Sequence, residues 1–169
     1  LGSAYALQGR LAEGRALLEE AISEAIRTGA LLNHSRWVAG LSEVCRLAGR
    51  GEEAWQHARQ ALDLARQLKE RGNEAHALYQ LGALHAHADP PDTEQAEAHY
   101  QQALALAEEL GMRPLVAHCH HGLGRLYHQT GRAAPARTAL STAIEMYRAM
   151  DMAFYLQRAG TALAEGAER

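Results

Sequence analysis

The densest group of chemically capable side chains is the run His118-Cys119-His120-His121. His118 and His121 lie three residues apart, so on a helix they share one side, about one turn from each other. Imidazole and thiolate groups bind zinc in proteins, but no CxxC or HExxH spacing accompanies this run. We therefore expect these side chains to pack and to line a polar surface, with no metal ion and no cofactor. The alternative is a small-molecule- or metal-responsive regulatory domain that uses this His cluster.

The remaining residues offer no catalytic arrangement. Cys45 and Cys119 belong to helices two repeats apart, about 20 Å if stacked helices are ~10 Å apart, so they cannot readily form a disulfide. No base accompanies Cys45, and the chain has no GxSxG sequence and no glycine-rich phosphate loop. We expect no catalytic residue, no enzyme activity and, from the two unpaired thiols, a cytoplasmic location.

Composition indicates a helical protein. Of the 169 residues, 47% are apolar but only 5% are aromatic, while Ala and Leu dominate over the β-branched residues that strands prefer. The net charge is −3 overall, with Arg and Glu interspersed, so the chain lacks the basic stripe that nucleic acid binding requires. No uncharged stretch is long and apolar enough to cross a bilayer. We expect an all-α fold and neither nucleic acid nor membrane as a partner.

A repeated pattern organises the chain. Leucine recurs at steps of 40, 40, 42 and 40 residues, each time followed by Gly, Ser or Ala: Leu1, Leu41, Leu81, Leu123 and Leu163. A glycine, or Asp89 in the third unit, stands eight residues after each of the first four leucines. A row of small, large and small residues then follows at helical spacing, as in Ala136, Leu140 and Ala143. The pattern therefore predicts that each unit consists of two antiparallel helices joined by a short turn.

The helices are predicted at 1–8, 11–28, 31–48, 52–70, 73–87, 93–110, 114–130, 133–149 and 152–165. They form one array with units at about 1–29, 30–71, 72–111 and 112–150 and a terminal helix in 151–169. Asp89-Pro90-Pro91-Asp92 lengthens the third turn, and Asp92 can cap the next helix. Because the first helix is incomplete and the chain does not begin with Met, we expect a fragment of a longer protein.

The sequence Leu123-Gly124, Tyr127, Gly131, Ala136, Leu140, Ala143 resembles the tetratricopeptide repeat, and four units agree in register. The period exceeds the usual ~34 residues of that repeat. It is similar to the extended repeats found carboxy-terminal in large bacterial signalling ATPases, cyclase-domain proteins and transcriptional activators. The resemblance implies a right-handed α-solenoid, or superhelix, whose first helices line a concave groove that binds a protein or peptide. Stacking of helix pairs independently favours such an extended surface.

The resemblance also implies which residues line the groove: those two and five positions to either side of each repeated leucine. This stripe is rich in His and Arg, so it could hydrogen-bond carboxylates and gain charge on mild acidification, while a plain solvated helix face is the alternative. The Lys and Asn of the carboxylate clamp of some relatives are missing. The candidate binding residues are Arg36, Glu43, Arg46, His76, Tyr79, His87, His118, His121, Arg125 and His128.

These features favour a non-catalytic scaffold or sensor module in a bacterial signalling protein. Its partner would be a protein or peptide, or other domains of the parent chain. A homodimer through the terminal helices is a further expectation, because Phe154, Tyr155 and Leu156 form an apolar patch near the end of the array.

Overall fold

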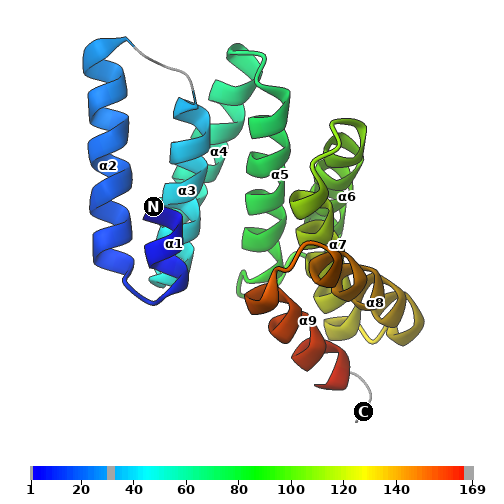
Figure 1. Ribbon diagram of the computed structural model, residues 1–169. Coiled ribbons are helices and arrows are strands. Elements are labelled where there is room, and N and C mark those ends of the chain that lie inside the picture. Colours follow the sequence, from blue (N-terminus) through cyan, green and yellow to red (C-terminus); the bar gives the residue numbers. More distant parts are fainter. Residues whose placement is uncertain (1, 30–32, 166–169) are drawn as a thin grey trace. The chain divides into compact units, whose positions relative to one another are not determined.

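The computed structural model describes residues 2–29 and 33–165, and this part of the chain contains helices and no strands (Figure 1). Every helix bound within it lies within three residues of the predicted one. The predicted helix start at 31, the repeated leucine at position 1 and the segment 166–169 lie outside the described residues. The helices are α1 (Gly2–Leu7), α2 (Leu11–Thr28), α3 (His34–Leu47), α4 (Gly51–Gln67), α5 (Arg71–Ala86), α6 (Thr93–Glu109), α7 (Arg113–Gln129), α8 (Ala133–Ala149) and α9 (Ala153–Glu165).

The chain divides into two compact units, Leu1–Leu84 and His85–Arg169. In the N-terminal unit α1 pairs with α2 and α3 with α4, and α2 also contacts α3. In the C-terminal unit α7 pairs with α8, while α6 packs on α7 and α9 packs on α8. The all-α helical repeat expected from the composition and the leucine pattern is therefore confirmed.

The turns inside the helix pairs follow one design. Gly131 has a φ of +73°, a conformation that favours glycine because it has no Cβ. This geometry lets the Arg132 N–H donate to the carbonyl of Tyr127 at 2.8 Å, and the Gly131 N–H to that of His128 at 3.1 Å. Gly9 and Gly49 occupy the same position in their turns, with φ of +82° and +73°. The helix ends predicted from these glycines are confirmed.

The third turn differs, as the Asp-Pro-Pro-Asp insertion predicts. α6 begins after Asp92, whose side chain accepts a hydrogen bond from the Gln95 N–H at 3.1 Å. A side-chain oxygen at this position satisfies one of the unpaired N–H groups at a helix start. The predicted cap is therefore confirmed.

Small residues after the repeated leucines let the paired helices approach closely. A Cβ on Gly124 would lie 2.6 Å from Cγ of Leu140 and 3.1 Å from its backbone nitrogen. In the α3–α4 pair the same position is Ser42, whose buried hydroxyl donates to the carbonyl of Ala54 at 2.8 Å. The spacing of each pair thus depends on the size of this residue.

Gly124→Ala is expected to lower the free energy of unfolding by about 1–3 kcal/mol, because the new methyl group would force α7 and α8 apart. Gly160→Ala in α9 is the control, since nothing lies within 4 Å of a Cβ there. That change is expected to raise stability by about 0.5–1 kcal/mol through helix propensity. Urea denaturation of both variants checks the pair, and equal effects would contradict close packing at Gly124.

Candidate functional site

The predicted binding residues are divided between the two units. Arg36, Glu43 and Arg46 lie on α3, and His76 and Tyr79 lie on α5; all five are half-buried. In the C-terminal unit His118, His121, Arg125 and His128 lie on α7, and His87 follows α5. Only His87 and Arg125 of the ten are classed as exposed. Within the C-terminal unit the predicted stripe separates into a buried cluster and an open depression.

The buried cluster consists of aromatic rings from three helices. Nδ1 of His118 lies 2.7 Å from the hydroxyl oxygen of Tyr147 on α8. The His118 ring also packs on Tyr155 of α9, with 4.5 Å between ring centroids, and Tyr147 stacks on Tyr155 at 5.6 Å. Tyr147 is fully buried, and burial raises the pKa of its hydroxyl. A hydrogen bond thus joins α7 to α8, and ring packing joins both helices to α9.

His121 belongs to the same cluster, with its ring edge-on to Tyr147 at 6.1 Å. Burial, together with the neighbouring Arg125, Arg158 and His118, lowers its pKa to about 4. His121 is therefore neutral at physiological pH. The expectation that this stripe gains charge on mild acidification does not hold for His121, because desolvation disfavours the imidazolium.

The other members of the run, Cys119 and His120, lie outside the aromatic cluster. Cys119 is fully buried, and burial raises the pKa of its thiol to about 12, so the thiol is protonated and unreactive. His120 is half-buried, and burial lowers its pKa. Among the described residues, no group of three or more His, Cys, Asp or Glu side chains has the arrangement of a metal site. Cys45 is likewise a buried free thiol, as its core position predicts.

The open depression lies between the carboxyl-terminal parts of α7 and α9. It has a volume of about 210 Å³ and is lined by Arg125, His128 and Gln129 from α7 and by Ala162 and Glu165 from α9. The guanidinium of Arg125 makes no hydrogen bond or ion pair within the described residues. Arg125 and His128, two of the predicted binding residues, thus line the same polar depression. It offers hydrogen-bond donors from α7 and the carboxylate of Glu165 from α9.

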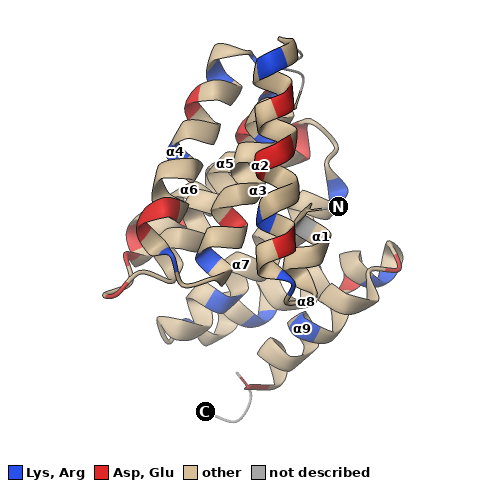
Figure 2. Cartoon of the chain, turned by 90° about the vertical axis from the view of Figure 1, so that its left-hand side faces the viewer, with Lys and Arg blue, Asp and Glu red and all other residues tan. Residues whose placement is uncertain are grey.

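Charge is strongly segregated in this unit, which the overall composition conceals. All charged residues in 85–112 are Asp or Glu, whereas all charged residues in 113–144 are arginines. By contrast, acidic and basic bands alternate along α2 of the N-terminal unit (Figure 2). A window shorter than one repeat would have detected this difference in the sequence. The arginines concerned are Arg113, Arg125, Arg132 and Arg137.

One of these arginines is paired across the segregated regions. Nη1 of Arg132 lies 2.7 Å from a carboxylate oxygen of Glu97, and the Tyr127 hydroxyl donates to the other oxygen at 2.9 Å. The Arg132 guanidinium also lies 4.2 Å from the centre of the Tyr127 ring. In contrast, the guanidinium groups of Arg113, Arg125 and Arg137 have no partner within residues 2–29 and 33–165. The segregation therefore leaves unpaired cations on α7 and α8.

Residues 92–149 match the family model of the tetratricopeptide repeat. This stretch of the chain therefore consists of tetratricopeptide repeats. The characteristic small and large positions of the repeat, Ala136, Leu140 and Ala143, are all buried between helices. Residues outside 92–149 have the same fold, as the following structural similarities show. A comparison with curated proteins finds no match.

Several solved structures superpose on most of the chain. A Rap protein complexed with competence and sporulation factor matches at 19% identity with a TM-score of 0.80, covering 98% of this chain and 49% of that protein. BtubC (BKLC) from P. vanneervenii matches at 19% identity and TM-score 0.66, covering 89% of this chain and 62% of that one. Nearly identical TPR-like repeats of a candidate kinesin light chain from Podosopora anserina match at 14% identity and TM-score 0.63, covering 99% of this chain and 92% of that one.

The chain thus spans about half the length of the Rap protein. At these identities the likeness shows the fold alone. None of the helices in the described part of the chain is long and apolar enough to cross a membrane.

Proposed function

We propose that this tetratricopeptide repeat domain is a non-catalytic module that binds a peptide segment of a protein partner through the α7–α9 depression. The observation that carries the proposal is the unpaired guanidinium of Arg125 beside His128, at a hollow whose floor is preformed by two helices. A preformed site orders few protein side chains when the ligand binds. Arginine forms strong, charge-assisted hydrogen bonds with carboxylates.

The ligand class follows from the lining. An acidic side chain of the peptide would meet Arg125, while Glu165 and Gln129 would accept and donate hydrogen bonds to its backbone or to a polar neighbour. Because residues 113–144 include arginines but no Asp or Glu, their positive charge attracts an acidic peptide over a distance. The Rap protein, which shares this fold, is complexed with a factor in its solved structure, and this supports a binding role.

Several finer features belong to the same proposal. The domain would serve as the sensor or scaffold end of a bacterial signalling protein and would act in the cytoplasm, where the buried thiols of Cys45 and Cys119 stay reduced. The partner segment could also belong to another domain of the parent chain. The candidate residues Arg36, Glu43, Arg46, His76, Tyr79 and His87 stay predictions for a surface of the N-terminal unit and the adjoining turn.

The test is peptide selection followed by measurement of affinity. Twelve-residue peptides selected on the domain from a random display library are expected to be rich in Asp and Glu. Arg125→Ala is expected to weaken the best peptide at least tenfold, as loss of a charged hydrogen bond does. Arg148→Ala on α8, an exposed arginine outside the depression, is the matched control and should leave affinity unchanged. Equal affinity of wild type and Arg125→Ala would contradict the proposal.

A further inference from the structure

A second hollow in the C-terminal unit differs from the depression in chemistry. It lies where α7, α8 and α9 meet and has a volume of about 230 Å³. Its apolar lining consists of Ala133, Ala136 and Leu140 from α8 and Leu163 from α9. Its polar lining consists of His128, Arg137 and Ser141.

The repeat pattern explains why a hollow exists here. At the corresponding place in the α1–α3 packing, Leu11 packs on the cluster that contains Leu18 and Leu41. Leu11 is the first residue of α2, and its counterpart as the first residue of α8 is Ala133. The aliphatic side chain that fills the first repeat is therefore reduced to a methyl group in the fourth.

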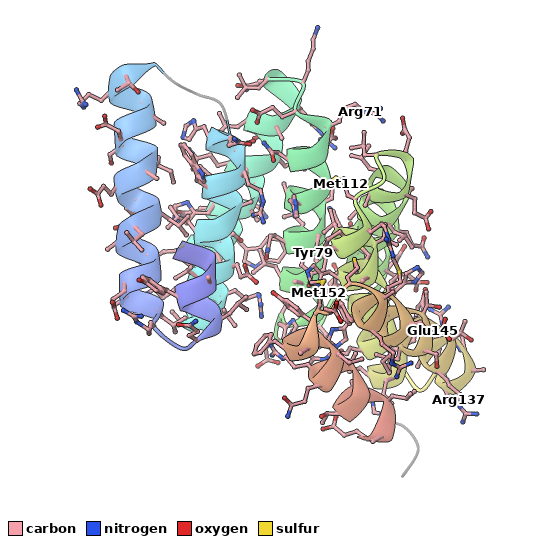
Figure 3. All side chains as sticks on the ribbon, viewed as in Figure 1. Arg71, Tyr79, Met112, Arg137, Glu145 and Met152 are labelled. Carbon is pink, nitrogen blue, oxygen red and sulfur yellow. The ribbon has the colours of Figure 1, made fainter. Side chains whose placement is uncertain are left out.

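The other repeats fill this place with aromatic residues. Trp55 of α4 packs on the cluster of Cys45, Ala58 and Leu81, and its counterpart in α8 is Arg137. In α6 the buried Tyr100 takes the position that Leu140 has in α8. The guanidinium of Arg137 extends from α8 away from the ribbon, so it fills no core space (Figure 3). The fourth repeat thus lacks the large apolar side chain of its predecessors.

The polar lining selects the charge of a ligand. No Asp or Glu lines the hollow among the described residues, whereas Arg137 brings a full positive charge and Ser141 a hydroxyl donor. The Arg137 guanidinium has no hydrogen-bond or ion-pair partner within the described residues, and the exposed Arg137 side chain lines the edge of the hollow. A polar, positively charged edge beside an aliphatic surface suits a ligand that has a carboxylate and a hydrocarbon chain.

The volume of the hollow limits the length of the ligand's hydrocarbon chain. An apolar cavity of about 150 Å³ in another protein holds a benzene molecule, so this hollow has room for about six to eight carbon atoms. We propose that the α7–α8–α9 hollow is a binding site for a small monocarboxylic acid, with its hydrocarbon chain on Leu140 and Leu163 and its carboxylate at Arg137. This site is independent of the peptide depression, although His128 lines both.

Titration calorimetry with hexanoate and with 1-hexanol tests the proposal on the whole chain. Hexanoate is expected to bind at a single site, and Arg137→Gln should weaken hexanoate at least fivefold while leaving 1-hexanol unchanged. Arg148→Gln is the matched control on the same helix and should affect neither probe. Ala133→Leu, which restores the residue of the first repeat, should abolish binding of both probes and leave the melting temperature equal or higher.

Three results would overturn the assignment: no heat from hexanoate at millimolar concentrations, undiminished binding to Ala133→Leu, or equal weakening of hexanoate by Arg137→Gln and Arg148→Gln. Each of these leaves the peptide proposal standing, because none involves Arg125. Conversely, failure of Arg125→Ala to weaken a selected peptide would leave the hexanoate result unaffected.

Discussion

Replacing Tyr147 by alanine is expected to lower the free energy of unfolding by about 3–5 kcal/mol. Tyr147 is fully buried, and its ring packs among residues of α7, α8 and α9, including Ala117 and Ala159. Removing the ring would leave a cavity between α7, α8 and α9, because packed helices collapse only partially onto a cavity. Urea denaturation followed by circular dichroism measures the loss.

Tyr147→Phe separates packing from hydrogen bonding. This variant keeps the ring and removes only the hydroxyl that lies 2.7 Å from Nδ1 of His118. The expected loss is about 1 kcal/mol, the usual worth of one hydrogen bond. If Phe proved as destabilising as Ala, the hydrogen bond would dominate, and the account of Tyr147 as a packing residue would be wrong.

Acidification is expected to destabilise the C-terminal unit through His121, by about 3 kcal/mol in total. The pKa of His121 is about 4 in the folded chain but near 6.5 once unfolded, so the unfolded state binds more protons between these values. The stabilisation is complete above pH 6.5 and is lost as the pH falls through about 4. Urea denaturation at intervals between pH 7 and pH 4 gives the free energy at each pH.

His121→Gln should remove this part of the pH dependence, because glutamine does not titrate. His99→Gln on α6 is the control, since His99 lies outside the buried aromatic cluster and bonds the carbonyl of Gln95 at 2.8 Å. Carboxylates titrate in both variants alike, so the difference in slope reports His121. Identical slopes for the two variants would contradict the account, because they would mean that folding does not lower the pKa of His121.

The helices and their turns were predictable because their signals are local. Gly131 and its counterparts end helices through a backbone geometry that needs no distant residue, and Asp92 caps α6 across three positions. The small residues after each leucine were also predictable, because they recur at the same position of the repeats. The close approach of Leu140 to Gly124 shows why a small residue is needed there.

The candidate site was less predictable because burial depends on neighbouring repeats. His121 was grouped with Arg125 from helical spacing, but His121 packs edge-on to the Tyr147 ring of α8, whereas Arg125 is exposed. Tyr155 and Leu156, expected in an apolar patch for a homodimer, are half-buried in the same core, while Phe154 is 46% exposed. The homodimer stays a prediction. The α7–α8–α9 hollow was not predictable from one repeat, because it depends on how the residues of the fourth repeat differ from those at equivalent positions of the others.

The central claim is that a peptide partner binds at Arg125 and His128, and histidine NMR tests it most directly. With ring-labelled histidines, titration of a selected acidic peptide should shift the His128 resonances, in proportion to the peptide bound. The buried His118 and His121 rings should move little. Shifts confined to His76 and His34, with His128 unmoved, would contradict the account and move the binding surface to the N-terminal unit.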